Sequence, residues 1–273
     1  MTLPRIGAFD SGVGGLTVLK AMAAQLPAHY LYFGDTARLP YGTKSAETVA
    51  RYAIAATQFL EAQTIDLLVI ACNTATALAL PRIQEAARVP VVGVVEPGAR
   101  MAAEVSQSRS ALVIATAATV SSHAYRDALQ RHGLQSYEKA CPLFVPLVEE
   151  GWVEHPVTEQ VARIYLDEAL LEVSDSPDVL VLACTHYPLI APLLRRIIPS
   201  QIQIVDSAES TAREVEHLLS QSLAPPGVEA SAAPPEHRTF RFYATDSVDK
   251  FKRLATRFLG RQVDHVEHID LGG

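Results

Sequence analysis

The chain has 273 residues, of which 49% are hydrophobic and 19% charged, and its formal net charge is −7. That length provides ample core for one large or two small domains, while the negative charge argues against a general binder of nucleic acids or anionic membranes. No signal peptide or bilayer-spanning apolar run is recognised, no CxxC or HExxH metal motif occurs, and three cysteines are too few for a disulfide scaffold, so we expect a cytoplasmic protein.

Short apolar runs alternate along the chain with longer periodic stretches. We expect buried strands at 6–9, 30–33, 67–71, 91–95, 112–115, 179–183 and 202–205. Helix-like periodicity is clearest at 46–63 and 159–173. This alternation predicts an α/β fold with parallel, helix-covered sheet.

The last part of the sequence departs from this alternation. The tract 223–237 contains four prolines and is typical of a surface loop or linker. A predicted strand at 239–244 and a predicted helix at 249–259 follow it, and neither aligns with another part of the chain.

An internal repeat relates two stretches of the sequence. Asp66-Leu-Leu-Val-Ile-Ala-Cys-Asn-Thr aligns with Asp178-Val-Leu-Val-Leu-Ala-Cys-Thr-His, an offset of 112 that pairs Cys72 with Cys184. The next strand of each unit is expected to end at an acid, Glu96 in one and Asp206 in the other. Any two buried strands can look alike, but the recurrence of both cysteine and acid favours two similar units.

Cys72 and Cys184 each follow a predicted strand and precede a polar helix start. Ligands of α/β folds bind at the carboxyl ends of strands, and a helix N-terminus favours a thiolate. We therefore expect the pKa of both thiols to fall from ~8.5 toward neutrality. A lone cysteine among apolar residues is usually inert core, and we give that interpretation to Cys141.

Two related thiols suggest a single chemistry. Inverting a carbon centre needs a base on one face and an acid on the other, and a pseudo-twofold pair of units supplies both. Matched thiols suit such proton exchange at cellular pH. A redox disulfide is the alternative, and the absence of CxxC disfavours it.

Three further residues are candidates for the same site. Asp10 ends the first strand in Asp10-Ser-Gly-Val-Gly-Gly, where glycines let a ligand approach the backbone, although a full GxGxxG and a Walker lysine are missing. Asp10 can orient a thiol or a substrate ammonium, or merely cap a helix. His186 is expected to assist Cys184, so that each thiol has its own helper. For Glu149 a site role and a solvated loop position are equally open.

At these residues the sequence resembles the glutamate racemase family. The shared motifs run in family order across nearly the whole chain: Asp10-Ser-Gly-Val-Gly-Gly, Gly34-Asp-Thr-Ala-Arg-Leu-Pro-Tyr-Gly, Ala71-Cys-Asn-Thr-Ala, Glu96-Pro-Gly-Ala, Ala115-Thr-Ala-Ala-Thr-Val, Pro146-Leu-Val-Glu, Ala183-Cys-Thr-His-Tyr-Pro and Val205-Asp-Ser-Ala. The resemblance implies two parallel-sheet α/β domains related by a pseudo-twofold axis, with the active site in the cleft between them. The first would span 1–97 completed by 207–273, and the second, 98–206, would be inserted into it.

The resemblance also implies an activity. It is the interconversion of L- and D-glutamate, without cofactor or metal, which supplies D-glutamate for peptidoglycan and hence for cell wall and cell shape. By match, Cys72 and Cys184 exchange protons with the substrate, Asp10 and His186 assist, and Glu149 lies near His186. The matching substrate-binding positions are Asp10, Ser11, Tyr41, Gly42, Asn73, Thr74, Thr116, Thr119, Thr185 and His186.

Small departures from the family pattern are present. Ala118 stands where the family often has Gly, which would shift that loop slightly. The long N-terminal extension of some members is not found, so we do not expect regulation by a cell-wall precursor.

Other functions are weighed against this one. Aspartate racemases of the same superfamily resemble the chain at the cysteines but typically carry Glu where His186 stands. A pyridoxal-phosphate racemase is disfavoured, because Lys44 is the only lysine close to a Gly-rich motif. A non-catalytic amino-acid-binding protein would leave the paired thiols idle. We expect glutamate as a small-molecule substrate and no nucleic-acid or membrane partner, and a homodimer is left open.

Overall fold

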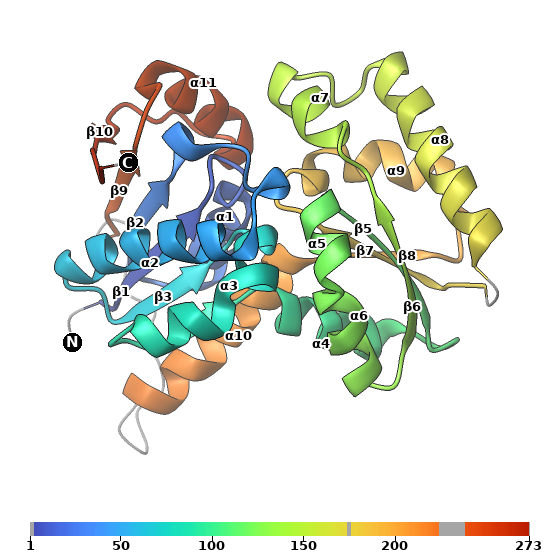
Figure 1. Cartoon of the computed structure of the whole chain (residues 1–273), viewed down its shortest axis with the longest axis horizontal. Helices are drawn as coiled ribbons and strands as arrows, with labels where there is room; N and C mark the ends of the chain where they lie inside the picture. The colour runs from blue at the N-terminus through green and yellow to red at the C-terminus, as the bar shows by residue number, and fades with distance from the viewer. Residues whose placement is uncertain (1–2, 174–175, 224–237, 273) are drawn as a thin grey trace.

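Two parallel β-sheets with helices packed on their faces make up the structure, a computed structural model that describes residues 3–173, 176–223 and 238–272 (Figure 1). The first sheet has the order β10-β9-β2-β1-β3-β4 and the second the order β6-β5-β7-β8. Every strand pairing is parallel. The predicted fold class is therefore confirmed. Of the predicted loop at 223–237, everything beyond Leu223 lies outside the described residues.

The bounds of the elements follow the chain. The strands are β1 (Arg5–Asp10), β2 (His29–Gly34), β3 (Leu67–Ile70), β4 (Val91–Gly93), β5 (Ser110–Ala115), β6 (Gln135–Ala140), β7 (Val179–Ala183), β8 (Gln203–Asp206), β9 (Phe240–Ala244) and β10 (Glu267–His268). The α-helices are α1 (Leu16–Gln25), α2 (Ala46–Ala62), α3 (Asn73–Ala86), α4 (Val95–Val105), α5 (Ala117–Ser122), α6 (Ala124–Arg131), α7 (Phe144–Glu150), α8 (Pro156–Glu172), α9 (Ala191–Ile197), α10 (Ser207–Leu223) and α11 (Val248–Leu259). Short 3₁₀ helices are η1 (Thr36–Arg38), η2 (Tyr41–Thr43) and η3 (Tyr187–Ile190).

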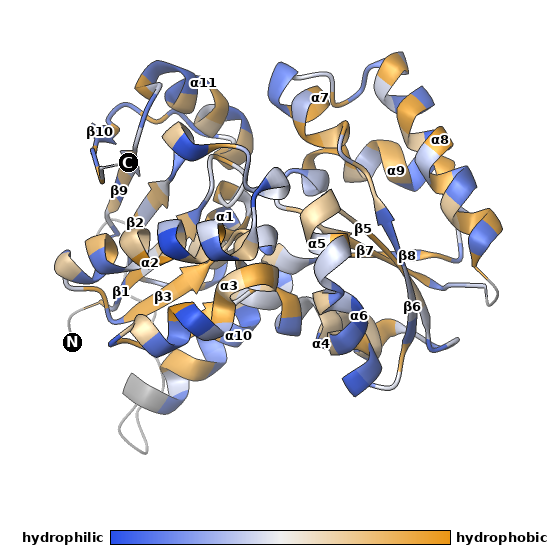
Figure 2. Cartoon of the chain, viewed as in Figure 1, coloured by the Kyte–Doolittle hydropathy of each residue, from blue (hydrophilic) through white to orange (hydrophobic). Residues whose placement is uncertain are grey.

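The central strands are apolar because both of their faces are covered. Every residue of β3, β5 and β7 is buried, as parallel sheets between helical layers require. Figure 2 shows hydrophobic residues gathered on these strands, while helices such as α2 and α8 alternate between hydrophobic and hydrophilic positions. In the described part of the chain, no helix is both long and apolar enough to cross a membrane.

The two sheets share one strand order, and the helix that follows each sheet packs against the other domain. The order β2-β1-β3-β4 matches β6-β5-β7-β8, and the two added strands, β9 and β10, extend only the first sheet. The offset of 112 persists into the next helices, which begin at Val95 (α4) and Ser207 (α10). Helix α4, which follows the first sheet, packs into the core of the second, whereas α10, which follows the second sheet, packs on α1 of the first.

Two sequence-based expectations need correction. The strand predicted at 91–95 ends at Gly93, and Glu96 lies in the first turn of α4, where it pairs with Arg131 and His132 on the surface. Asp206 does end β8, and its carboxylate accepts a hydrogen bond from the backbone of Ala208 at 2.8 Å. The equivalent of Asp206 under the 112-residue offset is Val94, so the acid is not part of the repeat.

Candidate active site

The loops that follow the central strands of the two sheets meet face to face. Thr74 Oγ1, after β3, lies 3.0 Å from Thr116 Oγ1, after β5. The hydroxyl of Thr17, on α1, donates to the carbonyl of Thr185, after β7, at 3.1 Å. The carboxyl ends of both sheets therefore enclose one shared region, and the predicted site residues gather there.

Cys72 is the N-cap residue of α3. Its sulfur accepts a hydrogen bond from the backbone N–H of Ala75 (3.4 Å) and lies 3.7 Å from the hydroxyl of Ser11. The residue is only 5% exposed. Burial, together with the negative charge of Asp10, raises the pKa of the Cys72 thiol to about 12 despite these hydrogen bonds.

Cys184 occupies the equivalent position after β7. It is also 5% exposed, and the backbone N–H of His186 points at its sulfur. Burial raises its pKa above the ordinary range, and charge on Cys72 raises it further. The expectation of lowered thiol pKa values is therefore wrong. The local helix N-terminus is present, but removing a thiolate from water between two domains outweighs it.

Asp10 ends β1 and is 1% exposed. Its Oδ2 accepts from the backbone N–H of Gly12 at 2.9 Å, whereas Oδ1 is buried with no partner. Burial raises the pKa of this carboxyl, and the nearby His186 lowers it. The backbone N–H groups of Gly12 and Gly15 also lower it. Because almost all buried polar atoms are paired, the unpaired Oδ1 makes Asp10 a candidate ligand-binding residue.

His186 lies across the interface from Asp10. Its Nε2 is 3.4 Å from Glu149 Oε1, and its Nδ1 is buried with no partner. Its ring packs edge-to-face with that of Phe258, with 5.1 Å between the ring centroids. Glu149 also pairs with Lys250 at 3.1 Å. Burial would raise the pKa of Glu149, but His186 and Lys250 outweigh it and lower that pKa to about 2.

Hydroxyl groups line the region opposite these ionisable groups. Thr119 Oγ1 lies 3.0 Å from Thr116 and 3.4 Å from Thr74. Gly42 faces the same cluster, since a Cβ built there would lie 3.4 Å from the Cβ of Thr116. The hydroxyl of Tyr41, by contrast, donates to the buried carboxylate of Asp35 at 2.6 Å and is engaged within the first domain.

Sequence reasoning missed the residues that hold Asn73. The hydroxyl of Tyr125, on α6 of the second domain, donates to Asn73 Oδ1 at 2.6 Å. Asn73 Nδ2 in turn lies 3.5 Å from the hydroxyl of Ser207. Neither helix residue carries a local signal, although Ser207 falls within the Val205-Asp-Ser-Ala motif. Together they orient the amide that follows Cys72.

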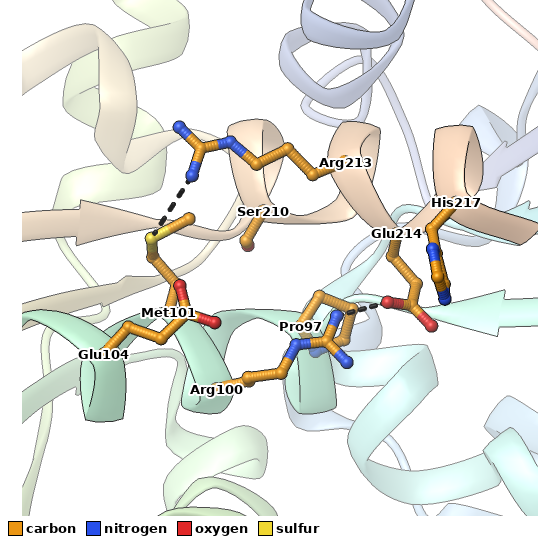
Figure 3. A pocket seen from close by; sticks show the side chains of 8 residues that line it. All are labelled: Pro97, Arg100, Met101, Glu104, Ser210, Arg213, Glu214 and His217. Carbon is orange, nitrogen blue, oxygen red and sulfur yellow. Dashed lines mark hydrogen bonds and ion pairs between the residues drawn. The ribbon is translucent and has the colours of Figure 1, made fainter.

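A separate cavity of about 230 Å³ lies between α4 and α10, away from the residues above (Figure 3). Its lining residues are Pro97, Arg100, Met101, Glu104, Ser210, Arg213, Glu214 and His217. Its arginines are already paired, Arg100 with Glu214 and Arg213 with Glu209. Within the described ranges, no three His, Cys, Asp or Glu side chains gather as metal ligands would.

Comparisons with known proteins identify a family and similar structures. The family described as Asp/Glu/Hydantoin racemase matches residues 11–215. A glutamate racemase from Koribacter versatilis is 59% identical, and the match covers 99% of this chain and 98% of that protein.

Solved structures resemble the chain over its whole length. The glutamate racemase of Thermus thermophilus, in complex with β-chloro-D-alanine, is 42% identical with a TM-score of 0.84, covering 98% of this chain and 97% of the other. That of Francisella tularensis, in complex with D-glutamate, is 33% identical with a TM-score of 0.87, covering 99% of each chain.

Proposed function

The chain belongs to the Asp/Glu/Hydantoin racemase family, and from that premise we propose that it interconverts L- and D-glutamate through two thiols, Cys72 and Cys184, on opposite faces of the substrate. One observation supports this mechanism above the others: the thiols are buried at equivalent ends of two equivalent strands, β3 and β7. The D-glutamate in the Francisella structure supports glutamate as the ligand.

The chemistry requires one thiolate and one thiol. The thiolate takes the proton from the α-carbon, and the opposite thiol then donates its proton to the other face, which inverts the centre and exchanges the two roles. A base of raised pKa accepts a proton from carbon more readily, so burial of Cys72 and Cys184 favours this step once the thiolate exists. The cationic ammonium of the substrate stabilises that thiolate when it binds.

Asp10 and His186 complete the acid/base set in this proposal. Their unpartnered atoms, Oδ1 and Nδ1, are buried and able to bind the substrate or relay protons. Asp10 acts mainly on Cys72, whose pKa it raises, and His186 approaches Cys184 through its backbone N–H. Glu149 orients His186 from the other side of the ring.

Neutral donors bind the two carboxylates of the substrate in this scheme. The N-terminus of α3 and the hydroxyl or amide groups around it suit anionic oxygens, and hydrogen bonds to charged acceptors are stronger than neutral ones. The proposed donors are Ser11, Asn73, Thr74, Thr116, Thr119 and Thr185, with the backbone at Tyr41 and Gly42.

Alanine variants of the cysteines test the mechanism. Cys72→Ala and Cys184→Ala should each abolish racemisation, followed by circular dichroism from either enantiomer. The matched control is Cys141→Ala, since Cys141 is buried in the core and, among the described residues, its sulfur hydrogen-bonds only to the carbonyl of Lys139, and it should retain the parent's activity. A single site variant that racemises glutamate at the parent's rate would show that two thiols are not required.

The same assay also tests whether the reaction needs a cofactor. We propose that the reaction needs no cofactor, takes place in the cytoplasm and supplies D-glutamate for peptidoglycan, with domains at 1–97 plus 207–273 and at 98–206. Protein treated with a chelator and freed of small molecules should keep its activity. Recovery of activity only on adding a metal or pyridoxal phosphate would overturn the cofactor claim, and faster turnover of aspartate would favour the aspartate racemase alternative.

A further inference from the structure

Helix α11 of the first domain reaches across the interface to the end of α7 in the second. Lys250 Nζ lies 3.1 Å from Glu149 Oε2. The guanidinium of Arg257 donates to the carbonyl oxygens of Val148 (3.1 Å) and Glu149 (2.8 Å). Two cations of one helix thus hold the residue that contacts His186.

The two oxygens of Glu149 are divided between two partners. Oε1 faces His186 Nε2, and Oε2 faces Lys250. The side chain of Glu149 is 17% exposed and that of His186 10%, whereas that of Lys250 is 51% exposed. An ion pair with so exposed a partner adds little to folding stability. Its charge nevertheless acts directly on the half-buried carboxylate of Glu149, whose pKa it helps to lower.

The groups that face His186 come from several elements. Asp10 acts on it from the end of β1, Glu149 from α7, and the ring of Phe258 packs edge-to-face with it from α11. The thiol of Cys184 lies on the same loop as His186 and accepts a hydrogen bond from the His186 backbone N–H. In the described part of the chain, Lys250 is the cation that pairs with the carboxylate of Glu149.

We propose that Lys250 is a positioning residue for proton transfer at Cys184: by holding Oε2 of Glu149, it directs the other oxygen to His186 and offsets the negative charge beside the imidazole. A carboxylate without that offset would favour the protonated ring. A group that must bind a proton in one direction and release it in the other works best when neither form dominates. This inference deepens the proposed racemase mechanism and rests on it.

The first test is the pH–rate profile of Lys250→Met in both directions. In the direction in which Cys184 takes the proton from the α-carbon, the acid limb of the profile should move to higher pH by roughly half a unit, because the imidazolium form is now favoured. Lys250→Arg should restore the parent profile. Lys252→Met is the matched control, since Lys252 makes no ion pair among the described residues, and it should leave the profile unchanged. Equal profiles for Lys250→Met and Lys252→Met would overturn the proposal.

A second measurement does not need turnover. The imidazole signal of His186, assigned by its loss in His186→Asn, is titrated by NMR in the parent and in Lys250→Met. Its midpoint should rise in the variant, and adding Lys250→Met to His186→Asn should change no rate further. The role of Lys250 is contradicted if the midpoint does not move, or if Lys250→Met lowers the rate equally in the parent and in His186→Asn. A parent that fails to racemise glutamate contradicts the proposed function instead.

Discussion

The thiols of Cys72 and Cys184 are weak acids here because they are withdrawn from water. Each is 5% exposed, and the carboxylate of Asp10 adds a like charge that opposes ionisation of Cys72. At neutral pH both thiols therefore carry their protons. In the proposed reaction one thiol is the acid as it stands, and the other becomes the base by giving its proton to a neighbouring group, Asp10 for Cys72 or His186 for Cys184.

Replacing Asp10 tests this electrostatic assignment. In Asp10→Asn the pKa of Cys72 should fall, since the charge that raises it is gone, and alkylation of Cys72 should begin at lower pH than in the parent. Rates for each cysteine can be read by mass spectrometry of the digested protein. Cys184 should change less, because Asp10 raises its pKa less than burial and the charge of Cys72 do. Cys141 is the internal reference, and a parallel change at Cys141 would point to general loosening.

Glu149 provides a prediction about acid stability. Its pKa is lowered to about 2 by His186 and Lys250, so its contribution to folding is present above its ordinary value of 4.5 and is lost as pH falls through about 2. Glu149→Gln should lower the urea midpoint at pH 7, and the gap from the parent should shrink toward pH 2. Glu150→Gln, one exposed residue further along, should show no such gap. A gap that stays constant with pH would rule out the ionic origin.

The site residues found from sequence share one property: a local signal. Cys72, Cys184 and Asp10 each stand directly after an apolar run, where strands deliver side chains to a common edge. Tyr125 and Lys250 come from helices that look like ordinary surface helices, and only tertiary packing brings them to the site. The direction of the thiol pKa shift was equally invisible, because it depends on burial between two domains.

At the scale of elements, apolar strands were predictable and the polar edge strand was not. Strand β6 (Gln135–Ala140) has the sequence QSYEKA and is nowhere fully buried. It lies at the edge of its sheet, where charged residues are common and an alternating hydrophobic pattern is not required. The strand predicted at 91–95 is too long for a different reason: Val94 and Val95 are apolar because both are buried beyond the end of β4, Val95 as the first residue of α4.

The glycine-rich loop after β1 gives a matched pair of variants. A Cβ on Gly14 would lie 2.6 Å from Nδ1 of His186, whereas one on Gly12 would meet only the side chain of Leu39 at 3.3 Å, which is partly exposed and able to move. Gly14→Ala should therefore force the domains apart at the site and lose nearly all activity while remaining folded. Gly12→Ala should lose far less. Similar kcat/KM for the two variants would contradict this close approach.

At the scale of the whole molecule, the buried thiols imply that the two domains must separate before glutamate can enter. A disulfide across the interface tests this. Gly42 and Thr116 suit one, since an added Cβ at Gly42 would lie 3.4 Å from the Cβ of Thr116, near the range that disulfides adopt. The Gly42→Cys/Thr116→Cys protein should be inactive when oxidised and more active after reduction. Equal activity in both redox forms would mean that substrate enters without separation.

The exchange of α4 and α10 between the two sheets has a mechanical consequence. The chain passes from one domain to the other twice, after β4 and after β8, and the two helices pack together beside these crossings (Figures 1 and 3). These two crossings define a line, and rotation of one domain about that line stretches neither crossing. We therefore expect opening to be a hinge rotation about the line that joins the two crossings. The walls that carry Cys72 and Cys184 then move apart together, so both faces of the site become accessible to the substrate at the same time.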